Sequence, residues 1–138
     1  MRRALVIPVA VAALLVPSAV LAANARADSS SCTFGSSSGN VYSCFGIQNT
    51  GTFVVEMNAS AAVQNAGRTL DVGLYGPCTN TQCPRIKHTG WRFVSPGHLI
   101  GTTWTPMAPI AAGTYCGVTT RLNGNNTSTI IAQQCAKV

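Results

Sequence analysis

Cysteine is the residue type in this chain with the most evident chemistry, and its six copies follow an apolar N-terminal stretch. They are Cys32, Cys44, Cys78, Cys83, Cys116 and Cys135. A cysteine can bind a metal, act as a nucleophile or form a disulfide, and the cellular compartment decides between these uses. An even number of cysteines in a short chain with a secretion signal is typical of a disulfide framework. We therefore expect disulfides rather than metal-binding or catalytic thiols.

Few other side chains are suited to catalysis. Beyond residue 27, the carboxylates are Asp28, Glu56 and Asp71, and the histidines are His88 and His98. Glu56 and Asp71 fall opposite the apolar positions of their segments, where a solvated side chain is expected, so a glycosidase-type carboxylate pair is not favoured. His88 or His98 with Asp71 would need a serine nucleophile, and no G-x-S-x-G segment accompanies them. We expect no enzymatic activity and no catalytic residue.

The sequence also predicts no metal and no cofactor. It contains no H-E-x-x-H segment, and the Cys78-x4-Cys83 pair would need two further ligands, of which His88 could supply one. A glycine-rich phosphate loop is absent from the sequence.

The first 27 residues have the three parts of a signal peptide. Met1-Arg2-Arg3 is positively charged, residues 4–16 are apolar, and Ala25-Arg26-Ala27 is a small-x-small cleavage site. The apolar part is too short to span a bilayer core of about 30 Å. We expect cleavage after Ala27, with Val20-Leu21-Ala22 as an alternative site. Residues 28–138 would then form a single domain that is secreted to the extracellular medium without a membrane anchor.

Cleavage would also change the charge. It removes Arg2, Arg3 and Arg26 from the nine basic residues and none of the three acidic ones. Six basic residues against three acidic residues give a net charge of about +3. This charge is too low and too dispersed to indicate nucleic-acid binding.

Short runs of β-branched and aromatic residues, separated by Gly, Asn, Ser and Pro, predict an all-β fold. Apolar residues alternate in 52–57, with Phe53, Val55 and Met57 on one face, and in 69–75, with Leu70, Val72 and Leu74 on one face. Further strands are expected at 86–94, 99–104, 114–122 and 127–136, and residues 60–66 are the one plausible helical turn. With the N-terminal segments, about seven or eight short strands result. We expect a disulfide-linked antiparallel β-sandwich of the immunoglobulin-like kind.

Hairpin geometry favours one of the fifteen pairings that six cysteines allow. A two-residue turn at Asn125-Asn126, or a four-residue loop over 124–127, places Cys116 opposite Cys135. A three-residue loop over 37–39 places Cys32 opposite Cys44. Cys78 and Cys83 most simply close a local loop, although these two could pair elsewhere. A linked peptide from Cys78 to Cys116 would exclude this set of disulfides.

A basic segment follows the Cys78–Cys83 loop. Cys83-Pro84-Arg85-Ile86 is similar to the reactive-site segment of the secreted subtilisin-inhibitor family of filamentous bacteria. The similarity implies that Arg85 enters a trypsin-like specificity pocket and that Ile86 follows the scissile bond. The alternative is a solvated basic strand.

Aromatic and basic residues near this segment form a second candidate for binding. Trp91, Phe93, Trp104 and Tyr115 could contribute to a contact patch with Arg85, Lys87 and Arg92, because interface hot spots favour Trp, Tyr and Arg. Tryptophan in a sandwich is, however, more often part of the core. The candidate protein-binding residues are Arg85, Ile86, Lys87, Trp91 and Arg92.

Longer segments of the chain resemble a group of small secreted six-cysteine proteins of filamentous bacteria. The resemblance lies in residues 70–77 (LDVGLYGP), 104–106 (WTP), 112–116 (AGTYC) and 131–138 (IAQQCAKV). Among such proteins are the small adaptor subunits of umbrella toxin particles, which act against competing bacteria. The resemblance implies an adaptor that joins lectin subunits with a trypsin-like domain to a repeat-containing toxin subunit. The close Cys78–Cys83 pair is a departure from that pattern.

Taken together, these features predict a secreted, non-enzymatic protein-binding module, most specifically an adaptor or accessory subunit of a secreted antibacterial toxin complex. A trypsin- or subtilisin-class protease inhibitor acting through Arg85 is the first alternative. A small-molecule carrier, similar to the secreted chromophore-binding sandwiches, is the second, and its support is architecture alone.

Overall fold

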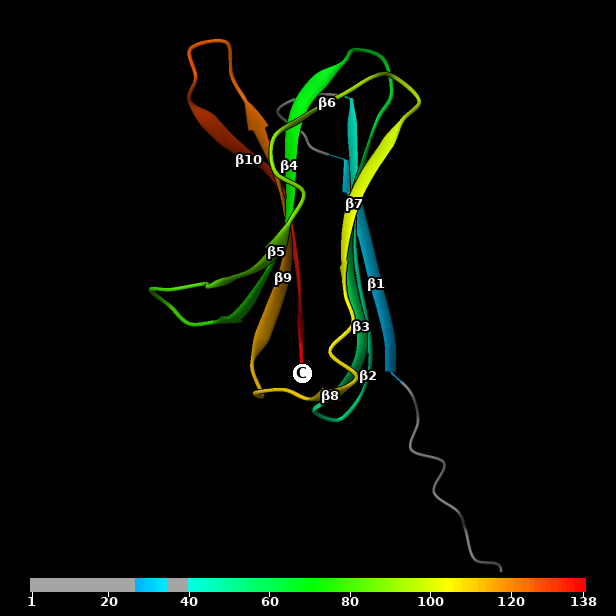
Figure 1. Ribbon diagram of the computed structural model, residues 1–138, viewed down its shortest axis with the longest axis vertical. Coiled ribbons are helices and arrows are strands. Elements are labelled where there is room, and N and C mark those ends of the chain that lie inside the picture. The colour runs from blue at the N-terminus through cyan, green and yellow to red at the C-terminus, as the bar shows by residue number, and fades with distance from the viewer. Residues whose placement is uncertain (1–26, 35–39) are drawn as a thin grey trace, which may run out of the picture.

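The computed structural model describes residues 27–34 and 40–138, which form two antiparallel sheets packed face to face (Figure 1). The predicted leader up to residue 26 and the predicted loop over 37–39 lie outside the described residues. The strands are β1 (Ala27–Phe34), β2 (Val41–Thr50), β3 (Phe53–Val63), β4 (Arg68–Cys78), β5 (Arg85–His88), β6 (Arg92–Val94), β7 (Leu99–Trp104), β8 (Ala108–Pro109), β9 (Thr114–Leu122) and β10 (Ser128–Lys137).

The order of the strands is that of an immunoglobulin-like sandwich with an extra strand at its N-terminal side. The first sheet has the order β1-β2-β3-β7, with β8 beside β3. The second sheet has the order β10-β9-β4-β5, with β6 beside β4. β2, β3 and β7 correspond to strands A, B and E of an immunoglobulin domain, and β10, β9, β4 and β5 to strands G, F, C and C′. The predicted all-β, disulfide-linked sandwich is confirmed.

A tyrosine at the start of β9 supports this assignment. Tyr115 is 2% exposed, and its hydroxyl donates a hydrogen bond of 2.8 Å to the carbonyl oxygen of Ala111. Immunoglobulin domains carry such a tyrosine near the start of strand F, where it bonds back to the chain a few residues upstream. Tyr115 therefore fixes the corner through which the chain enters the second sheet.

The core lies between the two sheets and follows the alternation of the strands. Leu70, Val72 and Leu74 are fully buried, as their spacing predicts. The first sheet contributes eight buried apolar residues, namely Val41, Phe45, Ile47, Val54, Met57, Ala59, Ala61 and Val63. This double layer of side chains is the main source of apolar burial in the sandwich.

Irregular pairing accounts for most differences from the sequence-based expectations. The register between β2 and β3 shifts at Gln48/Asn49, which leaves Val55 as an extra residue in β3. Such a bulge reverses the alternation, so Val54 is buried while Phe53 is 40% exposed. The prediction that Phe53 and Val55 share a face with Met57 is wrong.

Three further differences concern where elements begin and end. The expected helical turn at 60–66 is wrong, since β3 continues to Val63 with alternating buried residues. The expected strand over 86–94 is divided into β5 and β6, and Gly90 between them has a positive φ of 71°. This division, together with the short β8 and the separate β1, gives ten strands among the described residues instead of seven or eight.

We expect Gly117→Ala to lower the free energy of unfolding by about 2 kcal/mol through overpacking. A Cβ atom at this position would lie 2.9 Å from the Cβ of Phe45 and 3.1 Å from the Cβ of Ala59, on the facing sheet. Gly124→Ala is the matched control, because nothing lies within 4 Å of its Cβ position. Urea denaturation of both variants tests this, and equal stabilities would contradict it.

We expect stability to fall above about pH 10 in part through Tyr115. Burial raises the pKa of the Tyr115 phenol above its ordinary value. A raised pKa means that the folded state holds the proton more tightly, so stability is complete below the ordinary pKa and is lost as pH rises above it. Tyr115→Phe should cost about 1 kcal/mol at pH 7, from the lost hydrogen bond, and should flatten the decline above pH 10. Thermal unfolding between pH 7 and 11 measures both effects, and parallel curves would contradict the assignment.

Candidate functional site

All three predicted disulfides are present, and two of them join directly paired strands. Cys32 lies opposite Cys44 between β1 and β2, and Cys116 lies opposite Cys135 between β9 and β10. The β1–β2 register agrees with the predicted hairpin, whose loop is outside the described residues. Because no cysteine of the chain is free, the sulfur atoms provide no thiolate for a metal site.

The turn that leads to Cys135 differs from the predicted one. Asn123 pairs with Thr127 around a three-residue loop, in which Asn126 has a positive φ of 61°. The predicted turns pair Gly124 with Thr127, so the observed pairing of β9 with β10 begins one residue out of the predicted register. A shift between Ile130 and Ala132 in β10 restores the opposition of Cys116 and Cys135. The disulfide was therefore predicted correctly, but the turn was not.

The Cys78–Cys83 loop is closed by hydrogen bonds as well as by its disulfide. The amide of Thr79 donates to the carbonyl of Gln82 over 2.6 Å, and the Thr79 hydroxyl accepts from the Gln82 amide over 3.0 Å. At the base of the loop, the amide of Gly76 donates to the carbonyl of Pro84 over 2.8 Å. These bonds hold the loop in one conformation beside the start of β5.

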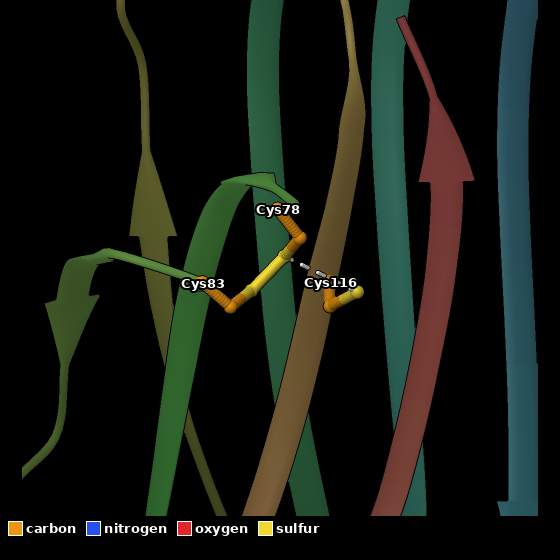
Figure 2. A group of neighbouring side chains, drawn as sticks. All are labelled: Cys78, Cys83 and Cys116. Carbon is orange, nitrogen blue, oxygen red and sulfur yellow. Dashed lines mark hydrogen bonds between the residues drawn. A yellow bond between two sulfur atoms is a disulfide. The ribbon is translucent and has the colours of Figure 1, made fainter. Parts of the chain in front are cut away.

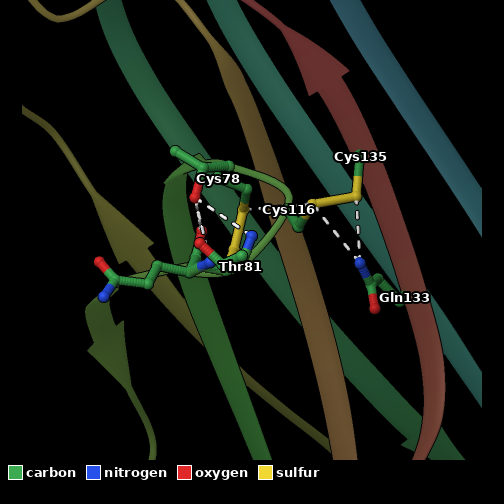
Figure 3. The surroundings of a disulfide bond; sticks show 8 residues. Cys78, Thr81, Cys116, Gln133 and Cys135 are labelled. Atoms are coloured by element: carbon green, nitrogen blue, oxygen red, sulfur yellow. Dashed lines mark hydrogen bonds between the residues drawn. A yellow bond between two sulfur atoms is a disulfide. The ribbon is translucent and has the colours of Figure 1, made fainter.

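This loop lies against the second disulfide. The Sγ atoms of Cys78 and Cys116 are 3.8 Å apart (Figure 2), and the side-chain amide of Gln133 reaches the sulfurs of Cys116 and Cys135 (Figure 3). Sulfur atoms from the loop, from β9 and from β10 therefore form one cluster on the outer face of the second sheet. The sequence spacing gave no sign of this contact, because it depends on the pairing of β4 with β9.

The five candidate binding residues do not form one patch. Arg85 is paired with Tyr75 on the outer face, and its guanidinium lies 5.9 Å from the centre of the Tyr75 ring. Lys87 is opposite the buried Leu74, so its side chain projects from the inner face of the second sheet, the face that packs on the first sheet. Ile86 is half-buried and packs against the core.

The candidate residues in and next to β6 are also not gathered on one surface. Arg92 is opposite the buried Leu70 and therefore faces the inner side with Lys87. Trp91 is 45% exposed, as expected of a binding residue, and Phe93 is exposed too. Trp104 packs against the core, and Tyr115 is part of it, so these two aromatic residues do not belong to a surface patch.

A polar network surrounds Asp71 on the outer face. Nδ1 of His88 lies 3.0 Å from Oδ2 of Asp71, and the hydroxyl of Thr89 donates to Oδ1 over 3.3 Å. The Asp71 side chain is only 12% exposed, so it is less solvated than its position predicted. On the other side of the ring, Nη1 of Arg85 lies 3.4 Å from Nε2 of His88. In a catalytic triad a nucleophilic hydroxyl would occupy that place.

Lys87 and Arg92 line a groove of about 510 Å³ between the edge strands β5 and β7. Its other wall consists of β7, from Leu99 to Thr103. The ammonium of Lys87 crosses the groove and donates a hydrogen bond of 2.8 Å to the carbonyl oxygen of Thr103. Sequence reasoning missed the contribution of β7, because nothing local in 99–104 indicates which strand it faces across the sandwich.

No protein-family model, curated protein or solved structure matches this chain. Residues 27–34 and 40–138 include no helix with the length and apolar character needed to cross a membrane. Three disulfides are typical of proteins that fold in an oxidising, extracytoplasmic compartment.

We expect Cys83→Ser to rearrange the neighbouring disulfide. The Cys78 thiolate would attack Sγ of Cys116 at 3.8 Å, form a Cys78–Cys116 bond and release Cys135 as a thiolate. Alkylation of the variant at pH 8.5, followed by non-reducing peptide mapping, should show the Cys78–Cys116 peptide and labelled Cys135. The double variant Cys78→Ser, Cys83→Ser is the control and should keep Cys116–Cys135. Label confined to Cys78 in the single variant would contradict the expected exchange.

Proposed function

We propose that this chain is a secreted, non-enzymatic protein-binding module. The observation that carries the proposal is the segment from Cys78 to Arg92. It presents exposed Arg85 on the outer face beside a disulfide-closed loop, and exposed Trp91 and Arg92 farther along, at the start of β6. A preorganised surface loses little conformational entropy when a partner binds. Arginine and tryptophan are also the residues that most often dominate protein interfaces.

Secretion is supported by two independent features. The first is the signal-peptide pattern of residues 1–27, and the second is the use of all six cysteines in disulfides. The absence of enzymatic activity is a proposal that rests on the side-chain chemistry. Among the described residues, the histidine–carboxylate pair of His88 and Asp71 has an arginine at Nε2, where catalysis would need a nucleophile.

In its most specific form, the proposal is an adaptor or accessory subunit of a secreted antibacterial toxin complex. The support is the resemblance in residues 70–77, 112–116 and 131–138, which now map to β4, the start of β9 and β10. The partners implied by that resemblance are a lectin with a trypsin-like domain and a repeat-containing toxin subunit. Two of these three segments carry the cysteines and tyrosine that hold the second sheet together.

Protease inhibition through Arg85 is the second candidate, favoured by the exposure of Arg85 directly after the disulfide-closed loop. The geometry of the Arg85–Ile86 bond gives this candidate less support. Arg85 is paired with Tyr75 of β4, and Ile86 packs against the core. A protease would have to reach a peptide bond inside a paired strand, whereas tight-binding inhibitor loops are preorganised outside such pairing.

We expect the purified, tagged protein to capture partner proteins from the culture supernatant of its source, and Arg85 or Arg92 to be required. Arg85→Gln or Arg92→Gln should weaken capture at least tenfold, which corresponds to a hot-spot loss of about 1.4 kcal/mol or more. Lys137→Gln is the matched control, since Lys137 is an exposed cation on β10, the opposite edge of the second sheet. Mass spectrometry of the captured proteins tests for the lectin and the toxin subunit.

Recovery of the bait alone, or capture unchanged in both arginine variants, would contradict the proposal. Titration of the same protein against trypsin separates the two candidates. Stoichiometric inhibition at micromolar concentration, lost in Arg85→Gln, would replace the binding module with the inhibitor.

A further inference from the structure

We infer that the groove between β5 and β7 binds an extended acidic segment of a partner protein, which adds as a strand to the edge of β7. The inference rests on the proposed function, because it names the chemistry of a partner for the same binding region. Three observations carry it. Among the described residues, the outer edge of β7 has no strand partner and two nearby cations have no carboxylate partner. A groove separates the two sheets at this edge.

β7 offers a main-chain edge to the groove. It pairs with β3 on one side, where Asn58 lies opposite Thr103. The carbonyl of Thr103 is directed to the other side, since it accepts a hydrogen bond from the Lys87 ammonium instead of a strand. In an antiparallel strand, alternate residues direct both their N–H and C=O groups to one side. Gly101 and Thr103 therefore present donors and acceptors in the spacing that an added strand requires.

The opposite wall of the groove is cationic. Lys87 and Arg92 both project from the inner side of the second sheet, because they pair with the buried Leu74 and Leu70. Among the side chains that the structure describes, at 29–34 and 40–138, the ion pair is the one between His88 and Asp71. Glu56 is hydrogen-bonded to Asn58 on β3. Lys87 and Arg92 are therefore left to attract carboxylates from another molecule.

A strand is a better match to this groove than a single anion. A phosphate ion would use the two cations but not the alternating donors and acceptors of β7. The side chains of an added strand alternate between the two faces, so that residues on one face recur about every 6.5–7 Å. Those facing the sandwich interior would point toward Lys87 and Arg92. An acidic residue at every second position would therefore place all its carboxylates on the cationic wall.

In the absence of a bound strand, the Lys87 ammonium covers part of the β7 edge. Its hydrogen bond to Thr103 satisfies an edge carbonyl and blocks indiscriminate strand pairing, a common use of lysine at sheet edges. An incoming strand would replace this bond with its own main-chain N–H and would give the ammonium a carboxylate. The exchange requires the Lys87 side chain to turn away from Thr103.

The test is NMR titration of the isotope-labelled protein with a seven-residue peptide. The peptide carries glutamate at its second, fourth and sixth positions and threonine or valine between them. We expect amide shifts centred on Gly101 and Thr103. Affinity should fall about threefold in Lys87→Gln and in Arg92→Gln, the size of a partly exposed ion pair, and should be unchanged in Lys137→Gln. Thr103→Pro removes a groove-facing N–H while leaving the pairing with β3 intact, so it should also weaken binding.

Control ligands decide whether strand addition is the mode of binding. A peptide of the same composition with its glutamates contiguous, inorganic phosphate and a single-stranded oligonucleotide should bind more weakly or shift other residues. The inference is overturned if any of these binds equally well at β7, or if the alternating peptide causes no shift at Gly101 and Thr103. If Thr103→Pro does not fold, the affinities of Lys87→Gln and Arg92→Gln for the alternating peptide still test the inference.

The outcomes separate this inference from the proposed function. Partner capture that depends on Arg85, with no peptide binding and no effect of Lys87→Gln, would overturn the groove and leave the binding module standing. Peptide binding at β7 without any captured partner would support the groove and count against the adaptor.

Discussion

The register of β9 is the constraint on which the rest of the structure depends, and three consecutive residues hold it. Tyr115 faces inward and bonds to Ala111, Cys116 faces outward and is bonded to Cys135, and Gly117 faces inward against Phe45. Each residue fixes a different neighbour: the incoming chain, the adjacent strand and the opposite sheet. A slip of one residue would exchange the two faces, directing Tyr115 to solvent and Cys116 into the core. The central strand of the second sheet therefore has one permitted position.

The segment that we propose for partner binding is held in place by this strand. β4 pairs with β9 on one side and with β5 and β6 on the other, so the fixed register is transmitted to Arg85, Lys87 and Arg92. The contact between Cys78 and Cys116 adds a second link between β9 and the loop that precedes β5. A register shift between Leu74 and Tyr75 leaves Ile86 as an extra residue in β5. Because such a bulge reverses the alternation, Arg85 and Lys87 point to opposite faces although they are two positions apart. Arg85 belongs to the outer surface with Tyr75 and His88, while Lys87 and Arg92 belong to the groove.

Features that depend on short-range pattern could be predicted from the sequence. The burial of Leu70, Val72 and Leu74 follows from alternation. Cys32–Cys44 follows from hairpin geometry and Cys78–Cys83 from its short separation. Cys116–Cys135 was paired correctly, but from a turn that differs by one residue from the observed one. The bulges at Val55, Ile86 and Ile131 could not be predicted, because an extra residue leaves no mark in composition. The groove could not be predicted either, because it is formed by residues of two different sheets, such as Lys87 and Thr103. The contact of His88 with Asp71 could be named as a candidate from residue type, but its geometry depends on the pairing of β5 with β4.

The placement of the disulfides bears on how the groove could work. Immunoglobulin domains commonly join their two sheets with a disulfide, whereas here Cys32–Cys44 and Cys116–Cys135 each join strands of one sheet, and Cys78–Cys83 closes a loop. Each layer is therefore stiffened internally, while the layers are held together by apolar packing and a few polar bridges. One bridge is Gln134 to the carbonyl of Ser43, and another is Lys87 to Thr103. At the β5–β7 edge, the two sheets are connected by the Lys87 hydrogen bond and not by a disulfide. The strand addition that we propose would have to exchange this hydrogen bond, whereas a disulfide at the same place would block it.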